Sequence, residues 1–340
     1  MDKAKWVRIG VAALVLFVAG VFLKLAQSIL VPFALALLFA FAVSPALDYL
    51  VGRKVPKAAA LVLILVVSFA ALYLVGMVFY SSGKSLASEL PSYTEMVREL
   101  LAKIDSLVPD PRLKVGLTDW IGGFNIGKVG TFLVGALGPF ASFMSDLLLV
   151  FAFMIFILAG RGRMVRKFGL AFPPAQAETL SRTVCRIDRE VQKYVAVKTL
   201  DNLVIGILVA AVLGILGVRF ALLFGVLAVF FNYVPVLGPI ASVAMPALLA
   251  LFLEGGLSLK VGLVLVLLIG IHVAVDRLLE RRLMTKEISL SPLLVLFSLF
   301  FWAWLWGIPG MILAVPLLTA ARIVFDNVPA LRSLGAMMDR

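Results

Sequence analysis

The sequence predicts an all-α polytopic membrane protein with eight hydrophobic segments: about six full transmembrane helices and two broken or re-entrant helical hairpins, with amphipathic surface helices beside them. Hydrophobic residues make up 63% of the chain and charged residues 15%, and the mean hydropathy is +1.11, far above a soluble domain. Apolar runs of roughly 20 residues, long enough to cross a bilayer, recur between single charges. Two longer uncharged stretches, 220–253 and 291–321, are each interrupted near the middle by proline and glycine.

Residues 1–83 are expected to form three transmembrane helices, at about 7–27, 28–50 and 57–80. The first apolar run follows a basic N-terminus, as it would in a signal peptide, but a second apolar run begins almost at once. This spacing favours an uncleaved transmembrane hairpin.

In the middle of the chain, a segment with equal numbers of basic and acidic residues is followed by a membrane crossing and then by a basic segment. Residues 84–137 are predicted to form an exterior amphipathic cap, in which 84–128 carry six basic and six acidic residues. A fourth transmembrane helix is expected over 138–160. Residues 161–198 then form a cytoplasmic amphipathic segment with nine basic and three acidic residues, and this segment leads directly into the next crossing.

The same charge asymmetry predicts the orientation of the chain. Basic loops remain on the cytoplasmic side of a membrane, so both termini and residues 161–198 are expected inside and residues 84–137 outside. The net charge of +12 is then mostly a consequence of topology. Its expected partner is the anionic lipid of the cytoplasmic face rather than nucleic acid.

Residues 199–340 are predicted to hold the transport core, with full crossings near 199–218 and 257–276. Each arm of its two broken stretches has about 11 to 15 residues, short of the roughly 20 that cross a bilayer. Broken helices that occur in pairs point to the binding site of a transporter. Proline-kinked crossings are the alternative to re-entrant hairpins, and the three tryptophans beside the second break, which resemble an interfacial belt, favour a kinked crossing there.

Nine residues at and near the breaks are the candidates for the substrate or ion path. Pro235 has no N–H group and Gly238 permits positive φ, so carbonyls freed at the first break could coordinate a cation or bind substrate hydroxyls. The amide of Asn202 needs polar partners if it is buried in hydrocarbon. The candidates are Asn202, Asn232, Tyr233, Pro235, Gly238, Pro239, Gly307, Pro309 and Gly310.

His272 and Asp276 stand four residues apart near the end of a predicted crossing and are the candidate coupling pair. A histidine one turn from a carboxylate can bind and release a proton near neutral pH. In the competing interpretation, Asp276 only pairs with arginines at the helix end. The presence of Asp201 at the start of a predicted crossing also has a local explanation, which is an ion pair with Lys198.

The sequence offers no pattern typical of an enzyme or a metal site. Cys185 is the only cysteine, which excludes an internal disulfide, and no zinc spacing, Walker loop or nucleophile elbow occurs. We therefore expect no enzymatic activity and no cofactor, apart from a transported or coupling Na⁺ or H⁺.

The order of elements resembles the autoinducer-2 exporter family of bacterial permeases. Three segments carry the resemblance: Lys198-Thr199-Leu200, Asn232-Tyr233-Val234-Pro235-Val236-Leu237-Gly238-Pro239-Ile240, and Ser291-Pro292-Leu293 followed by Gly307-Ile308-Pro309-Gly310-Met311 and Pro316. The resemblance implies a transporter of the bacterial inner (plasma) membrane, in a family whose members are linked to autoinducer-2 export or to sodium/proton exchange. The chain departs from the family pattern at Arg281 and at Phe300-Phe301-Trp302, beside the expected path.

The leading hypothesis is a secondary transporter, a permease or exporter, that moves a small polar solute such as an autoinducer-2-like signal and is coupled to H⁺ or Na⁺. In this hypothesis Asn232 and the turn after it contact the solute or a cation, and His272 and Asp276 provide the coupling. A monovalent cation/proton antiporter is the alternative transporter. A channel or scaffold without coupled turnover is the alternative from another class, and it would imply a homo-oligomer.

Overall fold

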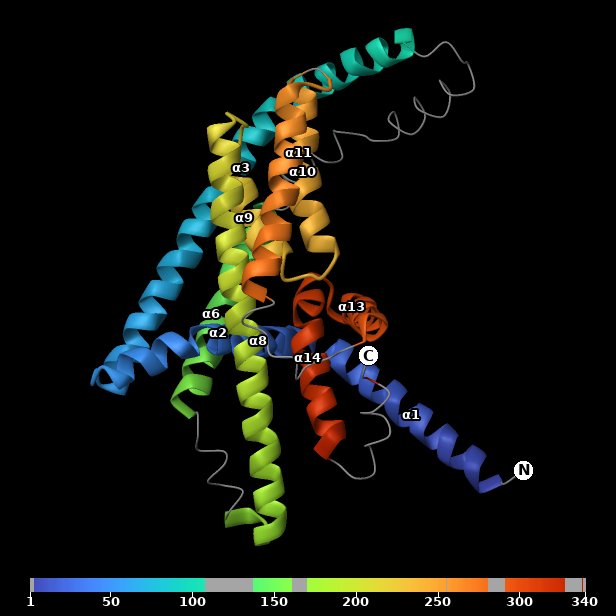
Figure 1. Ribbon diagram of the computed structural model, residues 1–340. Coiled ribbons are helices and arrows are strands. Elements are labelled where there is room, and N and C mark those ends of the chain that lie inside the picture. The colour runs from blue at the N-terminus through green and yellow to red at the C-terminus, as the bar shows by residue number, and fades with distance from the viewer. Residues whose placement is uncertain are drawn as a thin grey trace. The chain divides into compact units, whose positions relative to one another are not determined.

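The computed structural model describes residues 3–107, 137–160, 170–254, 256–280, 291–327 and 338, which are helical apart from short turns and connections. Contacts within the chain define two compact units. Unit 1 consists of Met1–Leu65, Asp146–Val197 and Met284–Arg340, and unit 2 consists of Val66–Ser145 and Lys198–Leu283. Two long helices, α3 (Lys57–Leu107) and α8 (Pro174–Ile215), contribute residues to both units (Figure 1).

Unit 1 is built on two apolar clusters that share helix α2. Small residues of α2 and α3, among them Ala36, Ala40 and Ala60, pack against Met154 and Leu158 of α6. The second cluster joins α2 to the first half of α8 and to α14. Besides its parts of α3 and α8, the unit contains α1 (Lys3–Leu25), α2 (Gln27–Gly52), most of α6 (Leu137–Gly160), α13 (Pro292–Trp306) and α14 (Ile308–Asn327).

Unit 2 has one continuous apolar core formed by the second half of α8 and the helices that follow it. Leu213, Ala228, Val264 and Leu268 are fully buried in it. Helix α10 packs against both α9 and α11. The unit contains α9 (Ala221–Phe231), α10 (Leu237–Leu253), α11 (Leu259–Val275) and η1 (Asp276–Glu280), a π-helical turn that continues α11.

The fold class predicted from the sequence is confirmed. Within the described residues the secondary structure is helical and no strand occurs. Five helical segments in this part of the chain are long and apolar enough to cross a membrane: Gln27–Gly52, Lys57–Ser82, Gln176–Ile215, Leu259–Leu278 and Ile308–Asn327. The shorter apolar helices include α9, α10 and α13.

Helices α3 and α8 each join a predicted membrane crossing to a neighbouring amphipathic segment. Helix α3 does not end near residue 80 but runs on to Leu107 as one helix of 51 residues. Helix α8 joins the basic amphipathic segment to the fifth crossing without interruption, as predicted. The rest of the expected exterior cap, 108–136, and residues 161–169 lie outside the described residues.

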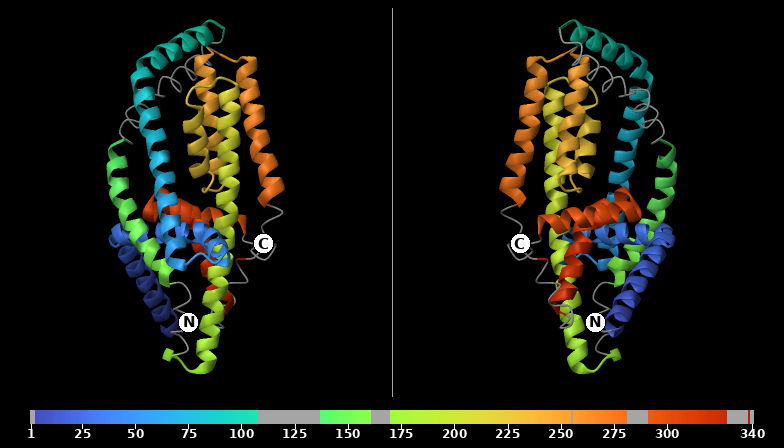
Figure 2. Two further views of the ribbon diagram at one scale, coloured as in Figure 1. Left: turned by 90° about the vertical axis from the view of Figure 1, so that its left-hand side faces the viewer. Right: turned by 90° about the vertical axis from the view of Figure 1, so that its right-hand side faces the viewer.

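Both broken stretches fold back on themselves. Helices α9 and α10 pack against each other and are joined by a short turn, which makes a helical hairpin, and α13 likewise packs against α14 (Figure 2). This geometry favours hairpins over collinear kinked crossings. The second stretch differs from expectation because α14 has 20 residues: it extends past the apolar run to Asn327, where Arg322 and Asp326 form an i,i+4 ion pair at 3.9 Å.

Candidate functional site

The turn between α9 and α10 is closed by backbone hydrogen bonds. The Val234 N–H donates to the Phe231 carbonyl at 2.8 Å, and the Leu237 N–H donates to the Pro235 carbonyl at 2.7 Å. The second bond spans two residues and forms a γ-turn. Its central residue, Val236, has φ 65° and ψ −55°, a strained conformation for a β-branched side chain. Carbonyls expected to be free for a cation therefore already accept bonds within the turn.

Gly238 is required at this turn because the backbone of the preceding helix approaches it closely. A Cβ atom there would lie 2.1 Å from the Phe231 carbonyl oxygen and 2.8 Å from the Asn232 Cα. The positive φ predicted for Gly238 is wrong, since Gly238 is helical and the residue with positive φ is Val236. Pro239 lies in the first turn of α10, where an N–H group would have no partner within the helix.

At the second break, too, the backbone of the preceding helix approaches a glycine closely. A Cβ atom at Gly310 would lie 2.0 Å from the Trp302 carbonyl oxygen. Gly307 ends α13 with φ 66° and ψ −140°, a conformation that favours glycine. Pro309 follows in the first turn of α14. These residues belong to unit 1, whereas the residues of the first break belong to unit 2.

The end of α13 is also held by α1. The Lys24 ammonium donates hydrogen bonds to the carbonyls of Leu305 at 2.7 Å and of Trp304 at 3.3 Å, and so caps carbonyls of the last turn. The Trp306 indole N–H donates to the Leu23 carbonyl at 3.1 Å. The tryptophans therefore do not act only as an interfacial belt, because Trp306 anchors the break to α1 within unit 1.

Two asparagines of unit 2 are buried without hydrogen-bond partners. Asn202 on α8 is 0% exposed and Asn232, directly after α9, is 2% exposed. Within the described part of the chain, neither the oxygen nor the nitrogen of either amide makes a hydrogen bond. Leaving a buried polar group unpaired costs about 1–3 kcal/mol, so these amides are the strongest sign of a polar ligand in the unit.

Helices α8 and α9 meet along a face of small residues, which fixes their register. A Cβ atom at Gly206 would lie 2.3 Å from Val229 Cγ2 and 2.7 Å from the Gly225 carbonyl oxygen. Nearer the start of the crossing, the Thr199 and Tyr233 hydroxyls are 2.7 Å apart, within hydrogen-bond distance. These contacts show that the two helices are antiparallel in this region.

The register brings the two buried asparagines to the same interface. Asn202 lies between Thr199 and Gly206 on α8, at the i, i+3 and i+7 spacing of one helix face. Asn232 lies between Val229 and Tyr233, which contact those same two positions. The interface of α8 with α9 and its following turn thus contains the amides of both asparagines.

A group of ionisable side chains lies in the same unit. Asp201 is 0% exposed, and its Oδ2 accepts a hydrogen bond from the Lys198 ammonium at 3.3 Å. His272 on α11 is 5% exposed, and its Nδ1 lies 2.9 Å from the Leu268 carbonyl, to which it donates when protonated. Helices α8 and α11 pack in one buried core that contains Ile205, Leu268 and Val275, and Asp201 interacts electrostatically with His272 and with Asp276, the first residue of η1.

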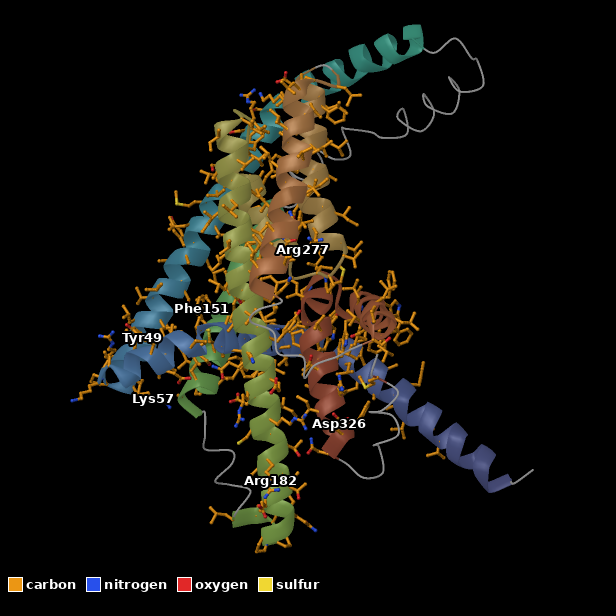
Figure 3. The ribbon with its side chains drawn as sticks, in the orientation of Figure 1. Tyr49, Lys57, Phe151, Arg182, Arg277 and Asp326 are labelled. Carbon is orange, nitrogen blue, oxygen red and sulfur yellow. The ribbon has the colours of Figure 1, made fainter. Side chains whose placement is uncertain are left out.

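The predicted coupling pair is not directly hydrogen-bonded. In the described residues, His272 Nε2 has no hydrogen-bond partner, and Nδ1 bonds to the backbone of its own helix. Asp276 is the first residue of the π-helical turn, a distortion frequent at functional sites. Its neighbour Arg277 is exposed (Figure 3), and Arg281, with which the competing interpretation pairs Asp276, lies outside the described residues.

Sequence reasoning underestimated Asp201. Its neighbour Lys198 explained the carboxylate locally, and that ion pair exists, but only the fold places Asp201 near α11. Its position inside an apolar crossing, beside a second polar residue, was the signal that pointed to it. In the part of the chain that is described, no group of three or more His, Cys, Asp or Glu side chains has an arrangement suited to a metal ion.

Comparison with known proteins identifies relatives along nearly the whole chain. Residues 11–330 match the family described as AI-2E family transporter. The chain is 27% identical over 327 residues to the AI-2 transport protein TqsA of Escherichia coli (strain K12), covering 96% of this chain and 93% of TqsA. It is 30% identical over 318 residues to YhhT of the same strain, which is named provisionally as a transport protein, covering 93% and 89%. With its helical fold, the chain is a multi-pass membrane protein that belongs to the AI-2E family of transporters.

Proposed function

We propose that this protein is a secondary transporter of the bacterial inner membrane that exports a small polar organic solute, coupled to H⁺ or Na⁺. An autoinducer-2-like signal is the first candidate, because the relative TqsA is named for AI-2 transport. The termini face the cytoplasm and the basic half of α8 lies against anionic lipid, in keeping with the charge asymmetry. The proposal includes no cofactor and no covalent step.

The observation that carries this proposal is the pair of unpartnered asparagines at the α8–α9 interface. Each amide offers an NH₂ donor and a carbonyl acceptor, and all of these groups on Asn202 and Asn232 are free of protein partners within the described residues. A solute with hydroxyl and carbonyl groups would satisfy both donors and acceptors. A bare cation would engage only the oxygens, so the chemistry favours a polar organic solute.

The other residues of the proposed path in unit 2 belong to the first break, where Tyr233, Pro235, Gly238 and Pro239 shape the turn that holds Asn232. In unit 1, Gly307, Pro309 and Gly310 shape the second break. His272 and Asp276 are proposed to couple the movement of the solute to that of an ion.

Counterflow in proteoliposomes tests the function and the role of Asn232 together. Vesicles loaded with unlabelled autoinducer-2 should accumulate labelled autoinducer-2 when they contain the wild-type protein. Asn232→Leu should reduce the rate at least about tenfold, as expected for about 1.4 kcal/mol of lost binding, while thermal stability stays equal or rises because an unpartnered amide is removed.

Ser242→Ala is the matched control for this experiment. Ser242 is also buried in unit 2, but its hydroxyl donates to the Gly238 carbonyl at 2.8 Å within its own helix. Its loss should leave counterflow nearly unchanged. Wild-type vesicles that fail to exchange autoinducer-2, yet dissipate a pH gradient when Na⁺ is added, would replace this proposal with the cation/proton antiporter.

A further inference from the structure

Asp201 is a buried carboxylate with only half of its hydrogen-bonding capacity used. The side chain is 0% exposed. Its Oδ2 accepts from Lys198 at 3.3 Å, but Oδ1 has no partner within the described residues. Lys198 is itself largely buried, with 13% of its side chain exposed. A buried ion pair that leaves one carboxylate oxygen unsatisfied is costly as a purely structural element.

The described ionisable groups near Asp201 come from α8, α11 and η1 of unit 2. Lys198 lies on the same helix, His272 comes from α11 and Asp276 from η1, and all three act on Asp201. From the α9–α10 turn, Tyr233 contacts Thr199, two residues before Asp201. A buried carboxylate with an unsatisfied oxygen is costly to keep charged, and a proton bound at Oδ1 of Asp201 removes that charge.

We propose that Asp201, together with Lys198, His272 and Asp276, forms a site that binds one transported proton. The inference rests on the proposed function and deepens it, because it selects H⁺ as the coupling ion and adds Asp201 to the pair considered from sequence. When the proton is bound, Asp201 is a neutral acid that can donate from its oxygen. When the proton leaves, the ammonium of Lys198 stabilises the carboxylate, and no other cation has to enter the cluster.

The site is placed so that the proton and the solute act on one another. Asp201 directly precedes Asn202 on α8, and Thr199 two residues earlier contacts Tyr233 in the turn that holds Asn232. A change in the Lys198–Asp201 pair therefore acts on the helix that carries one buried amide and contacts the turn that carries the other. Exchange of an exported solute for an incoming proton requires that proton and solute favour different arrangements of α8 and the turn, so that binding of one weakens binding of the other.

Infrared spectroscopy of the purified protein tests the proton site without reference to any solute. The wild-type protein should show a protonated carboxyl C=O band that disappears as pH rises, and Asp201→Asn should lack that band. Glu254→Gln is the matched control, because Glu254 also pairs with a lysine in unit 2, at 3.0 Å from Lys260, but is partly exposed. If Asp201→Asn and wild type give the same pH-dependent carboxyl signal, the proposal is overturned.

Transport measurements then separate the proton site from the solute site. Asp201→Asn should lose the stimulation of uptake by a pH gradient, measured relative to its own counterflow, whereas Glu254→Gln should keep that stimulation. Lys198→Met should move the pH midpoint of transport upward, because a carboxylate without its ammonium counterion holds its proton more strongly, and Lys260→Met should not.

The double variant Lys198→Met/Asp201→Asn tests whether a loss of coupling is only a result of misfolding, because removing both members of a buried ion pair is often tolerated. It should fold and remain uncoupled from the pH gradient. Stimulation of uptake by the pH gradient that persists in Asp201→Asn would overturn the proposal. Absence of counterflow in wild type would instead contradict the proposed function, and the infrared result would still decide the proton site.

Discussion

The two breaks are built on single residues that allow backbone to approach backbone. Gly238 and Gly310 both face a carbonyl oxygen from the last turns of the preceding helix, at distances no side chain would permit. Val236 supports the first break in another way, by adopting the positive φ of a γ-turn, a strained conformation that costs about 1–3 kcal/mol. Such strain persists only where the surrounding structure enforces it, which is consistent with a turn that has a function.

Gly238→Val tests whether the close approach holds the first hairpin together. The new side chain would force the backbone of Phe231 and Asn232 to move, so we expect a loss of about 3 kcal/mol of stability and abolished counterflow, with protein still present in the membrane. Gly262→Val on α11 is the control, because a Cβ atom there meets nothing within 4 Å. Equal thermal stability and full counterflow in both variants would show that the close approach is dispensable.

At the same scale, the sequence predicted which polar residues are buried better than it predicted the geometry of the break. Asn202, Asn232 and His272 were selected as polar residues in apolar surroundings, and each is buried. The reason given for Gly238 was partly wrong, because positive φ at a break is assigned to glycine by default, whereas here a valine adopts it. Asp201 was set aside because its long-range neighbours come from α11, 70 or more residues later in the chain, and no local pattern reveals them.

At the scale of elements, helix α8 links most features of the proposed site. It provides Asp201 and Asn202, contacts the α9–α10 turn through Thr199, and packs on α9 through Gly206. The sequence predicted its amphipathic first part and the direct continuation of that part into a crossing. The sequence did not predict where α3 ends, because a polar amphipathic segment can continue a transmembrane helix without any stop signal.

Gly206→Leu and Gly214→Leu form a matched pair on α8 that tests the α8–α9 contact. A side chain at Gly206 would collide with Val229 and the Gly225 backbone, whereas a Cβ atom at Gly214 meets nothing within 4 Å. We expect Gly206→Leu to lose about 1–3 kcal/mol of stability and most of its counterflow, and Gly214→Leu to lose little of either. Thermal unfolding in detergent and the vesicle assay measure both effects, and similar behaviour of the two variants would contradict the register.

At the scale of the whole molecule, the chain is a multi-pass membrane protein, and the distribution of its charges predicts an orientation. Apolar segments alone predicted that it crosses the membrane, and the five crossing-length helices of the described residues agree with this prediction. Apolar segments do not specify the orientation of the protein across the membrane, because an apolar helix partitions into lipid equally well in both orientations. Direction depends on the excess of lysine and arginine in one set of loops, which is why the segment 161–198, with nine basic residues, determines the predicted topology.

Cysteine labelling in intact cells tests that orientation at two exposed positions. Cys185 is exposed and would react itself, so both variants are made in a Cys185→Ser background. Lys84→Cys should react with an impermeant thiol reagent added outside, because the segment that begins there has balanced charge. Arg182→Cys, at a side chain that is 77% exposed on the basic part of α8 (Figure 3), should react only after the membrane is permeabilised. Labelling of Arg182→Cys alone in intact cells would invert the topology and move the proposed lipid contact to the outer face.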